Sequence, residues 1–293
     1  MTYRAALGII AMGLSSSAVG CSDASAWDGY GLSDNQIVFG IEQSKNAAGN
    51  LQTTVGYEFL DVRNQGSAPR GFVSDGRSCW AERLDDRLGQ PRVEGGVAIF
   101  TGAALPDKGI AILANRPDEL VLEAPAWTRG GDRLRFEAKG FAMPTIGPET
   151  LTVPSTDLAI RAPADAAAEI AIDPRQDLAI AWSAGEPDAP AAPGENVVAS
   201  LVAAPPGTAD ARGVELRCFF PRDAGKGQFP SSILNRFAAL ASSGKGVIKG
   251  KLRIATHRQL TIFADGGWTV YVVASVDQRT QPFTLAPPIP EAH

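Results

Sequence analysis

The stretch DRLRFEAK, residues 132–139, shows most directly which kind of fold this chain adopts. Leu134, Phe136 and Ala138 alternate with charged residues, and successive side chains of a β-strand point to opposite faces of its sheet. The alternation therefore predicts a strand with one buried and one solvated face. The Arg-Gly-Gly sequence at 129–131 predicts the turn that precedes it.

Similar short runs with a two-residue period recur along the chain and are separated by turn residues. The 31 glycines and 21 prolines, together with the scarcity of long helical patterns, favour an all-β chain. We predict strands at 37–42, 55–63, 78–85, 93–100, 109–114, 120–123, 132–139 and 151–153, and then at 177–182, 196–203, 214–220, 246–256, 259–263 and 268–276.

One segment, residues 230–244, has a helical pattern instead. Ile233, Leu234, Phe237 and Leu240 fall on one face of a helix of two to three turns, and serines at its start can cap it. We expect this helix to cross between strands and to close one end of a sandwich.

A mature chain of about 270 residues is long for one β-sandwich and sufficient for two. Prolines at 144, 148, 154 and 163 punctuate its middle, and proline is excluded from sheet interiors. We therefore predict a signal peptide at 1–20, a tether at 21–36, an N-terminal β-sandwich at 37–154, a linker at 155–168, a C-terminal β-sandwich with the helix at 169–286, and a Pro-rich tail at 287–293.

The second half of the chain contains the runs Asp-Leu-Ala-Ile-Ala-Trp at 177–182, Leu-Arg-Cys-Phe-Phe-Pro at 216–221 and Gly-Trp-Thr-Val-Tyr at 267–271. With Phe-Pro at 229–230 and Ile-Leu at 233–234, they resemble the C-terminal sandwich of uncharacterised bacterial lipoproteins. The resemblance covers about 110 residues and implies two consecutive β-sandwich domains of the immunoglobulin or fibronectin-III type. It brings no catalytic residues, and a fold does not supply a function.

The first residues have the composition of an export signal. Residues 1–4 are positively charged, residues 5–14 are apolar or glycine, and residues 15–20 are small. An apolar run of about ten residues is too short to cross a bilayer as a helix. We therefore expect the protein to be exported, with the leader removed.

Two cleavage sites are possible after this leader. The sequence Ala-Val-Gly-Cys at 18–21 resembles the lipobox of bacterial lipoproteins, although its first position is usually Leu. This resemblance implies that Cys21 is lipidated, and Ser22 in place of an Asp implies the outer membrane or cell surface. The alternative site, Ala-Ser-Ala at 24–26, would release a soluble periplasmic or secreted protein that begins at Trp27.

With Cys21 lipidated, Cys79 and Cys218 remain, and an oxidising compartment would allow them to pair. In residues 214–220, however, the alternation directs Cys218 toward a core, and in residues 78–84 Trp80 belongs to the inward set while Cys79 faces outward. We therefore expect two separate thiols, with Cys218 buried.

The sequence lacks the motifs of common active sites, including G-x-S-x-G, H-E-x-x-H, a phosphate-binding loop and a calcium loop. The two histidines are His257, expected in an exposed turn, and the last residue, His293. They are too few for a zinc site, and we predict neither a metal nor a cofactor. A secreted hydrolase with a carboxylate-based site on loops of the first domain remains the alternative. The one adjacent acidic pair, Asp85 and Asp86, is expected to close a charged turn instead.

Binding is the function that the remaining features favour. The net charge of −5 and the dispersed basic residues exclude a nucleic-acid partner. Trp127, in a proline-containing loop, is the candidate exposed aromatic residue for a ligand-binding patch. We expect a non-enzymatic envelope lipoprotein that is held to the membrane by its N-terminal lipid and serves in binding, adhesion or envelope assembly, with an envelope protein or a carbohydrate as partner.

Overall fold

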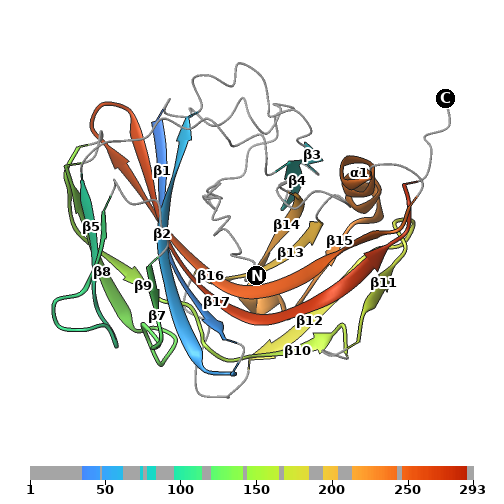
Figure 1. Cartoon of the computed structure of the whole chain (residues 1–293), viewed down its shortest axis with the longest axis horizontal. Coiled ribbons are helices and arrows are strands. Elements are labelled where there is room, and N and C mark those ends of the chain that lie inside the picture. Colours follow the sequence, from blue (N-terminus) through green and yellow to red (C-terminus); the bar gives the residue numbers. More distant parts are fainter. Residues whose placement is uncertain are drawn as a thin grey trace. The chain divides into compact units, whose positions relative to one another are not determined.

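A computed structural model describes residues 35–46, 48–61, 73–74, 78–83, 96–113, 120–140, 144–164, 168–184, 194–203, 213–242 and 246–288 (Figure 1). These residues form seventeen strands, one α-helix and a short 3-10 helix at Arg222–Ala224. The predicted all-β class, with one helix in the second half of the chain, is confirmed. The predicted signal peptide and residues 21–34 of the predicted tether lie outside the described residues.

The first half of the chain contains nine strands, and each pairs with an antiparallel neighbour. They are β1 (Asn35–Lys45), β2 (Leu51–Asp61), β3 (Val73–Ser74), β4 (Cys79–Arg83), β5 (Val97–Gly102), β6 (Ile110–Leu113), β7 (Leu120–Leu122), β8 (Arg133–Lys139) and β9 (Ile146–Thr152). The strand predicted at 132–139 is β8, whose Leu134, Phe136 and Ala138 are buried as the alternation predicted.

The second half contains the helix and the longest strands. Its elements are β10 (Leu158–Ala162), β11 (Ile170–Ile172), β12 (Leu178–Ala184), β13 (Asn196–Ala203), β14 (Val214–Pro221), β15 (Lys226–Phe229), α1 (Ser231–Ala241), β16 (Ile248–Ala264) and β17 (Trp268–Leu285). Three sheets result, with the hydrogen-bonded orders β3-β4-β14-β13-β16-β17-β1-β2-β7, where β11 also pairs with β17, then β10-β12-β15, and β6-β5-β8-β9.

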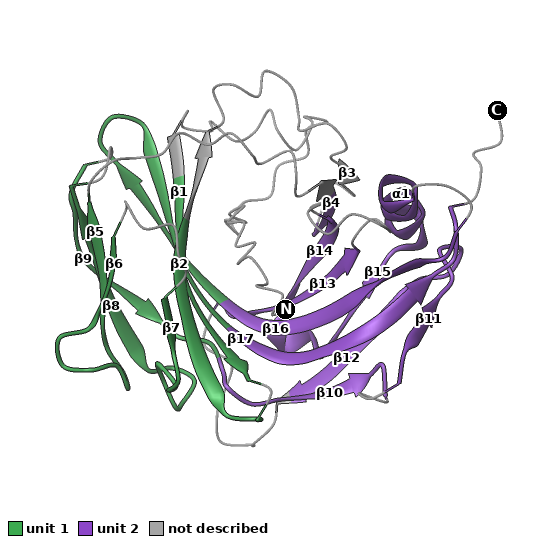
Figure 2. Ribbon diagram, in the orientation of Figure 1, with its two compact units in different colours: residues 1–66, 89–154, 258–275 green, residues 67–88, 155–257, 276–293 purple. Residues whose placement is uncertain are grey.

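The chain divides into two compact units that are not consecutive in sequence (Figure 2). Unit 1 comprises residues 1–66, 89–154 and 258–275, and unit 2 comprises residues 67–88, 155–257 and 276–293. These ranges differ from the predicted domains because β4 pairs with β14, and because β16 and β17 each contribute residues to both units. The predicted linker, 155–168, contains β10 and the buried residue Ser155.

Unit 1 is a sandwich in which β1 and β2 face the sheet of β5, β6, β8 and β9. The ring centroid of Phe39 on β1 lies 4.9 Å from that of Phe136 on β8, and Phe100 on β5 lies 5.1 Å from Phe136. All three rings are fully buried. Aromatic rings at these distances join the two layers into one core.

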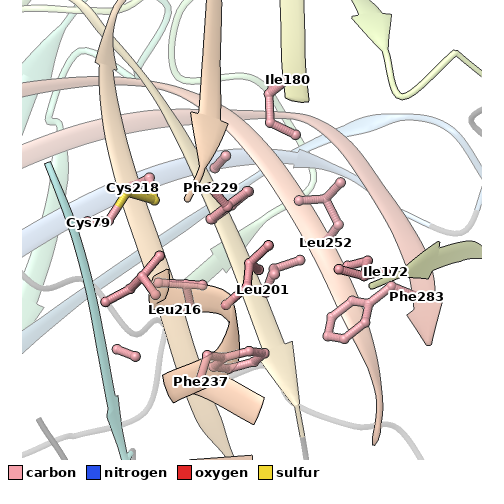
Figure 3. Packing of buried hydrophobic residues seen from close by; sticks show 14 of the residues in the cluster. Cys79, Ile172, Ile180, Leu201, Leu216, Cys218, Phe229, Phe237, Leu252 and Phe283 are labelled. Atoms are coloured by element: carbon pink, nitrogen blue, oxygen red, sulfur yellow. A yellow bond between two sulfur atoms is a disulfide. The ribbon is translucent and has the colours of Figure 1, made fainter. Parts of the chain in front are cut away.

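Unit 2 is a second sandwich, with its core between the three-stranded sheet and the strands β13, β14, β16 and β17 (Figure 3). Leu158, Ile180 and Phe229 supply one layer of this core, and the facing strands supply residues such as Leu201 and Leu252. The same cluster includes the buried side chains of α1, which are Ile233, Leu234, Phe237, Ala238 and Ala241. The helix predicted from its apolar stripe therefore packs on this core.

The start of α1 is held by a residue distant in sequence. The residue before the helix is Pro230, and its side chain makes no capping hydrogen bond. Instead, the backbone N–H of Ser231 donates a hydrogen bond of 2.7 Å to Oδ1 of Asp177. A carboxylate in this position satisfies one of the first N–H groups and complements the helix dipole.

Candidate binding face

One surface of unit 2 combines charged and aromatic residues on the side of its sheet opposite the apolar core. Because Leu216 and Cys218 belong to the core, the alternation of β14 directs its odd-numbered residues to the other side. By the same reasoning, Trp80 of β4, Ser200 of β13 and the odd-numbered residues of β16 lie on the side opposite the core. We call this side of the sheet the polar–aromatic face and define it as Trp80, Ser200, Glu215, Arg217, Phe219, Arg253 and His257. All of these residues are buried except Arg253, which is partly exposed.

The strand register places four of these residues in one row across the sheet. Trp80 lies opposite Arg217, Arg217 lies opposite Ser200, and Ser200 lies opposite Arg253. Directly paired residues have Cβ atoms about 4.5–5.5 Å apart, so each neighbours the next. Two arginines therefore flank a serine hydroxyl, with an indole ring at one end of the row.

Both arginines are paired with carboxylates. Nη2 of Arg217 donates to Oε1 and Oε2 of Glu215, at 2.8 and 2.9 Å, and the two side chains are 10% and 7% exposed. Arg253 lies 3.6 Å from Oδ2 of Asp277, and its side chain is 32% exposed. With Asp277 included, the two arginine charges are balanced by two carboxylates. The Arg217 side chain is almost inaccessible to solvent, whereas the Arg253 side chain is partly exposed.

An aromatic cluster adjoins this row. The rings of Trp80 and Phe219 stack with centroids 5.1 Å apart, and the ring of His257 meets Phe219 edge-on at 5.3 Å. Trp80 is buried, and within the described residues its indole N–H has no hydrogen-bond acceptor. A buried donor without an acceptor costs free energy.

The position of His257 corrects the sequence prediction of an exposed turn. Residues 246–256 and 259–263 were expected to form separate strands, but β16 runs unbroken from Ile248 to Ala264 and places His257 within it, opposite Asn196. The side chain is 7% exposed. The hairpin turn lies instead at residues 265–267, where two glycines adopt positive φ.

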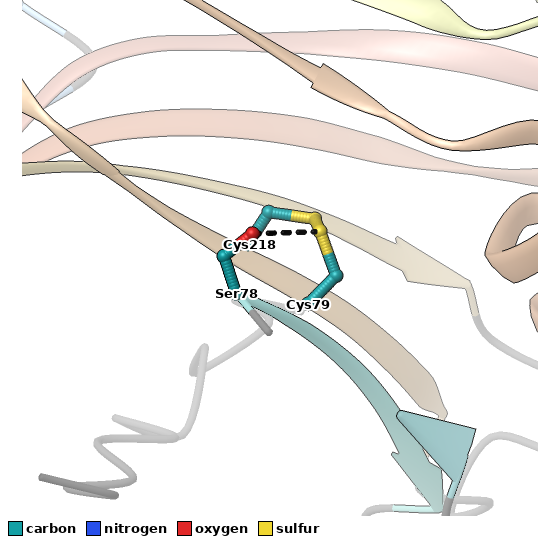
Figure 4. The surroundings of a disulfide bond; sticks show 3 residues. All are labelled: Ser78, Cys79 and Cys218. Atoms are coloured by element: carbon teal, nitrogen blue, oxygen red, sulfur yellow. Dashed lines mark hydrogen bonds between the residues drawn. A yellow bond between two sulfur atoms is a disulfide. The ribbon is translucent and has the colours of Figure 1, made fainter. Parts of the chain in front are cut away.

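The prediction of two separate thiols is wrong. Cys79 and Cys218 form a disulfide, with their Cα atoms 4.1 Å apart (Figure 4). They lie directly opposite each other in the β4–β14 ladder, and the Oγ atom of Ser78 lies 3.9 Å from the Cys79 sulfur. Cys218 is buried as predicted, but Cys79 is buried too, because Cys79 and Ala81 face the same core while Trp80 lies on the other side of β4.

The candidate ligand-contacting residue Trp127 is also corrected by the structure. It is fully buried in unit 1, where its indole N–H donates to the carbonyl oxygen of Pro154 at 3.2 Å. Nε2 of Gln43 donates to the Trp127 carbonyl oxygen at the same distance. Trp127 is therefore a core residue that presents no ring face to a ligand.

Other predicted positions lie outside the described residues. They are the lipidation site Cys21, the acidic pair Asp85 and Asp86, and His293. Within the described residues, no three His, Cys, Asp or Glu side chains come together as a metal site. No helix among those residues is long and apolar enough to span a membrane.

Local contacts displace the pKa values of Tyr57 and Asp173. Burial raises the pKa of the Tyr57 phenol in unit 1. The hydrogen bonds from Arg175 lower the pKa of the Asp173 carboxyl, and this exposed pair closes a turn before β12.

Comparison with known proteins gives little further information. No protein-family model and no curated protein matches the chain. Among solved structures, it is similar to the crystal structure of the FN1–FN3 domains of chicken CNTN1, with 10% sequence identity and a TM-score of 0.19. The match covers 85% of this chain and 63% of that one. We draw no conclusion about fold or function from a likeness this slight.

The polar–aromatic face was not anticipated from the sequence. Glu215 and Arg217 are the charged residues in the alternation that predicted a buried Cys218, and in the structure they pair with each other in a buried position. The available signal was their spacing, because opposite charges two residues apart in a strand lie on the same face. The apolar residues on both sides of this pair are consistent with a strand buried on both faces.

Proposed function

We propose that the protein is an exported, lipid-anchored envelope protein that acts by binding rather than by catalysis. The observation that supports export is the buried disulfide between Cys79 and Cys218. Structural disulfides form and persist in oxidising compartments and are rare where thiols are kept reduced. A disulfide that joins β4 to β14 therefore agrees with a secreted fate.

The pairing also bears on the anchor. The chain has three cysteines, and two of them are consumed by the disulfide. Cys21 is thus the one cysteine left for lipidation, at the position where the leader ends. A disulfide between Cys21 and another cysteine would argue against lipidation of Cys21. Cys79 and Cys218 are bonded to each other and therefore offer Cys21 no such partner.

The part of the polar–aromatic face around Arg253 is the proposed contact surface. Arg253 is partly exposed beside Asp277, so its guanidinium can donate hydrogen bonds to a polar partner. Such a surface fits an envelope protein or a carbohydrate, and it fits adhesion or envelope assembly better than a reaction that requires a free nucleophile or base.

Two measurements test this function. Replacement of Cys21 by Ala is expected to move the protein from the membrane fraction to the soluble fraction, and a wild-type protein that is soluble and begins at Trp27 would contradict the anchor. A photo-crosslinking residue at position 253 is expected to capture a partner in intact envelopes. The matched control is position 108, in the exposed β5–β6 turn of unit 1. Equal capture at both positions would contradict the contact surface.

A further inference from the structure

The tip of the hairpin between β16 and β17 has an unusual surface. We define the hairpin tip as Phe263, Ala264, Asp265, Gly266, Gly267 and Trp268. Phe263 is 83% exposed, whereas the other exposed large apolar residues in the described chain are 40–59% exposed. Trp268, on the other side of the turn, is partly exposed. The tip therefore presents one phenyl ring to solvent, with a partly accessible indole across the turn.

The backbone of the tip suits a narrow, well-defined projection. Gly266 and Gly267 have φ values of 74° and 75°, in the left-handed region that glycine adopts without strain. A turn of this kind connects two strands tightly and holds the residues on either side in fixed positions. The exposure of Phe263 is thus a property of an ordered hairpin.

The scarcity of charged residues in the sequence around the tip indicates a partner that is not recognised by its charge. Residues 259–276 contain a single charged residue, Asp265, and no lysine or arginine. A surface of this composition gains nothing from anionic groups, because electrostatic attraction to them requires basic residues. The remaining contribution is the transfer of aromatic surface out of water.

From this surface we infer that the hairpin tip inserts into the interfacial region of a lipid bilayer. A specific protein interface uses about 20–30 residues on each side, far more than the six residues of this tip. An interfacial contact needs only a few aromatic side chains, and Trp is enriched at the boundary between acyl chains and water. The inference rests on the proposed lipid anchor, since stable membrane attachment takes two weak signals acting together.

A thiol label at the tip reports its environment. Because Cys79 and Cys218 are paired and buried, Phe263→Cys places an accessible thiol at the tip for a bimane probe, whose apolar ring takes the place of the phenyl ring. Val247→Cys is the matched control, since Val247 is 59% exposed and lies in unit 2. Both proteins are reconstituted into phosphatidylcholine vesicles, with Cys21 intact and, separately, with Cys21→Ala at high lipid concentration.

With Phe263→Cys we expect the fluorescence emission of the probe to shift to the blue and its quenching by aqueous iodide to be lost. Both effects are expected with Cys21 intact and with Cys21→Ala. The probe at Val247→Cys should remain accessible to iodide. Partitioning of the Cys21→Ala protein into the same vesicles should fall roughly tenfold or more with Phe263→Ser and should not change with Val247→Ser. A water-exposed probe at position 263 in both forms would overturn the inference, as would equal shifts at 263 and 247.

The two proposals can fail separately. Fractionation that shows lipid attachment at Cys21, together with an exposed probe at 263, would leave the anchor in place and refute the insertion. A tip probe buried in vesicles by the Cys21→Ala protein, with no lipid found on Cys21 in the wild type, would refute the anchor and support the insertion.

Discussion

Loss of the Cys79–Cys218 disulfide should destabilise unit 2 by several kcal/mol. The bond joins residues separated by 139 positions, so the unfolded chain with the disulfide intact is restricted by a very long loop. In the chain-entropy description, closing a loop of this length stabilises the folded state by about 5 kcal/mol. The double variant Cys79→Ala/Cys218→Ala lacks this restriction in its unfolded state.

The packing around the bond adds a smaller contribution of the same sign. Both sulfur atoms lie in the apolar core of unit 2, where Cys79 and Cys218 are 1% and 0% exposed. Replacing them with Ala removes buried atoms and costs about 1 kcal/mol more for each small cavity. Measured losses often fall below the entropic value, so we expect a total of roughly 3–5 kcal/mol.

Urea unfolding followed by tryptophan fluorescence measures this loss in the full-length protein. Cys21→Ala serves as the reference, and the double variant is made in the same Cys21→Ala background, so that the two proteins differ only in the disulfide. Mass spectrometry of the unreduced, alkylated and denatured protein provides an independent check, and a linked peptide containing both cysteines is expected. Two alkylated cysteines, or a double variant within about 1 kcal/mol of the reference, would refute the reasoning.

Two further predictions concern unit 2. Arg217→Met should cost about 3–5 kcal/mol in urea unfolding, because it leaves the Glu215 carboxylate buried without its partner, whereas Glu215→Leu/Arg217→Met should cost much less. Additive costs for the two single variants would contradict this coupling. Limited trypsin digestion should spare Arg161, because β10 is hydrogen-bonded to β12, while Lys108 in an exposed turn is cut. Early cleavage at Arg161 would instead support the predicted flexible linker.

Local patterns determined several elements of this protein without tertiary information. The alternation of residues 132–139 predicted β8, and the apolar stripe at 233–240 predicted α1. Residues 196–203 were predicted as a strand with the bounds that β13 has. These elements have one face or stripe against a core, so their period of 2 or 3.6 residues is written directly in the sequence.

Strands that are buried on both faces could not be interpreted this way. In β14 the charged Glu215 and Arg217 are buried like the apolar residues beside them, and in β4 both Cys79 and Trp80 are buried. Alternation reports which side chains differ in polarity, and it marks the solvated face only when one face is solvated. The outward assignment of Cys79 failed for this reason, and with it the prediction that the cysteines stay apart.

Long-range pairing also lay beyond the sequence. The hydrogen bond from Trp127 to Pro154 joins residues 27 positions apart, and the Cys79–Cys218 disulfide joins residues 139 positions apart. The pairing of β4 with β14, and the continuity of β16 through His257, decide which segments share a unit. A sequence pattern records what each strand buries, whereas only the tertiary structure decides against which partner it is buried, because many strands present equivalent apolar faces and edges.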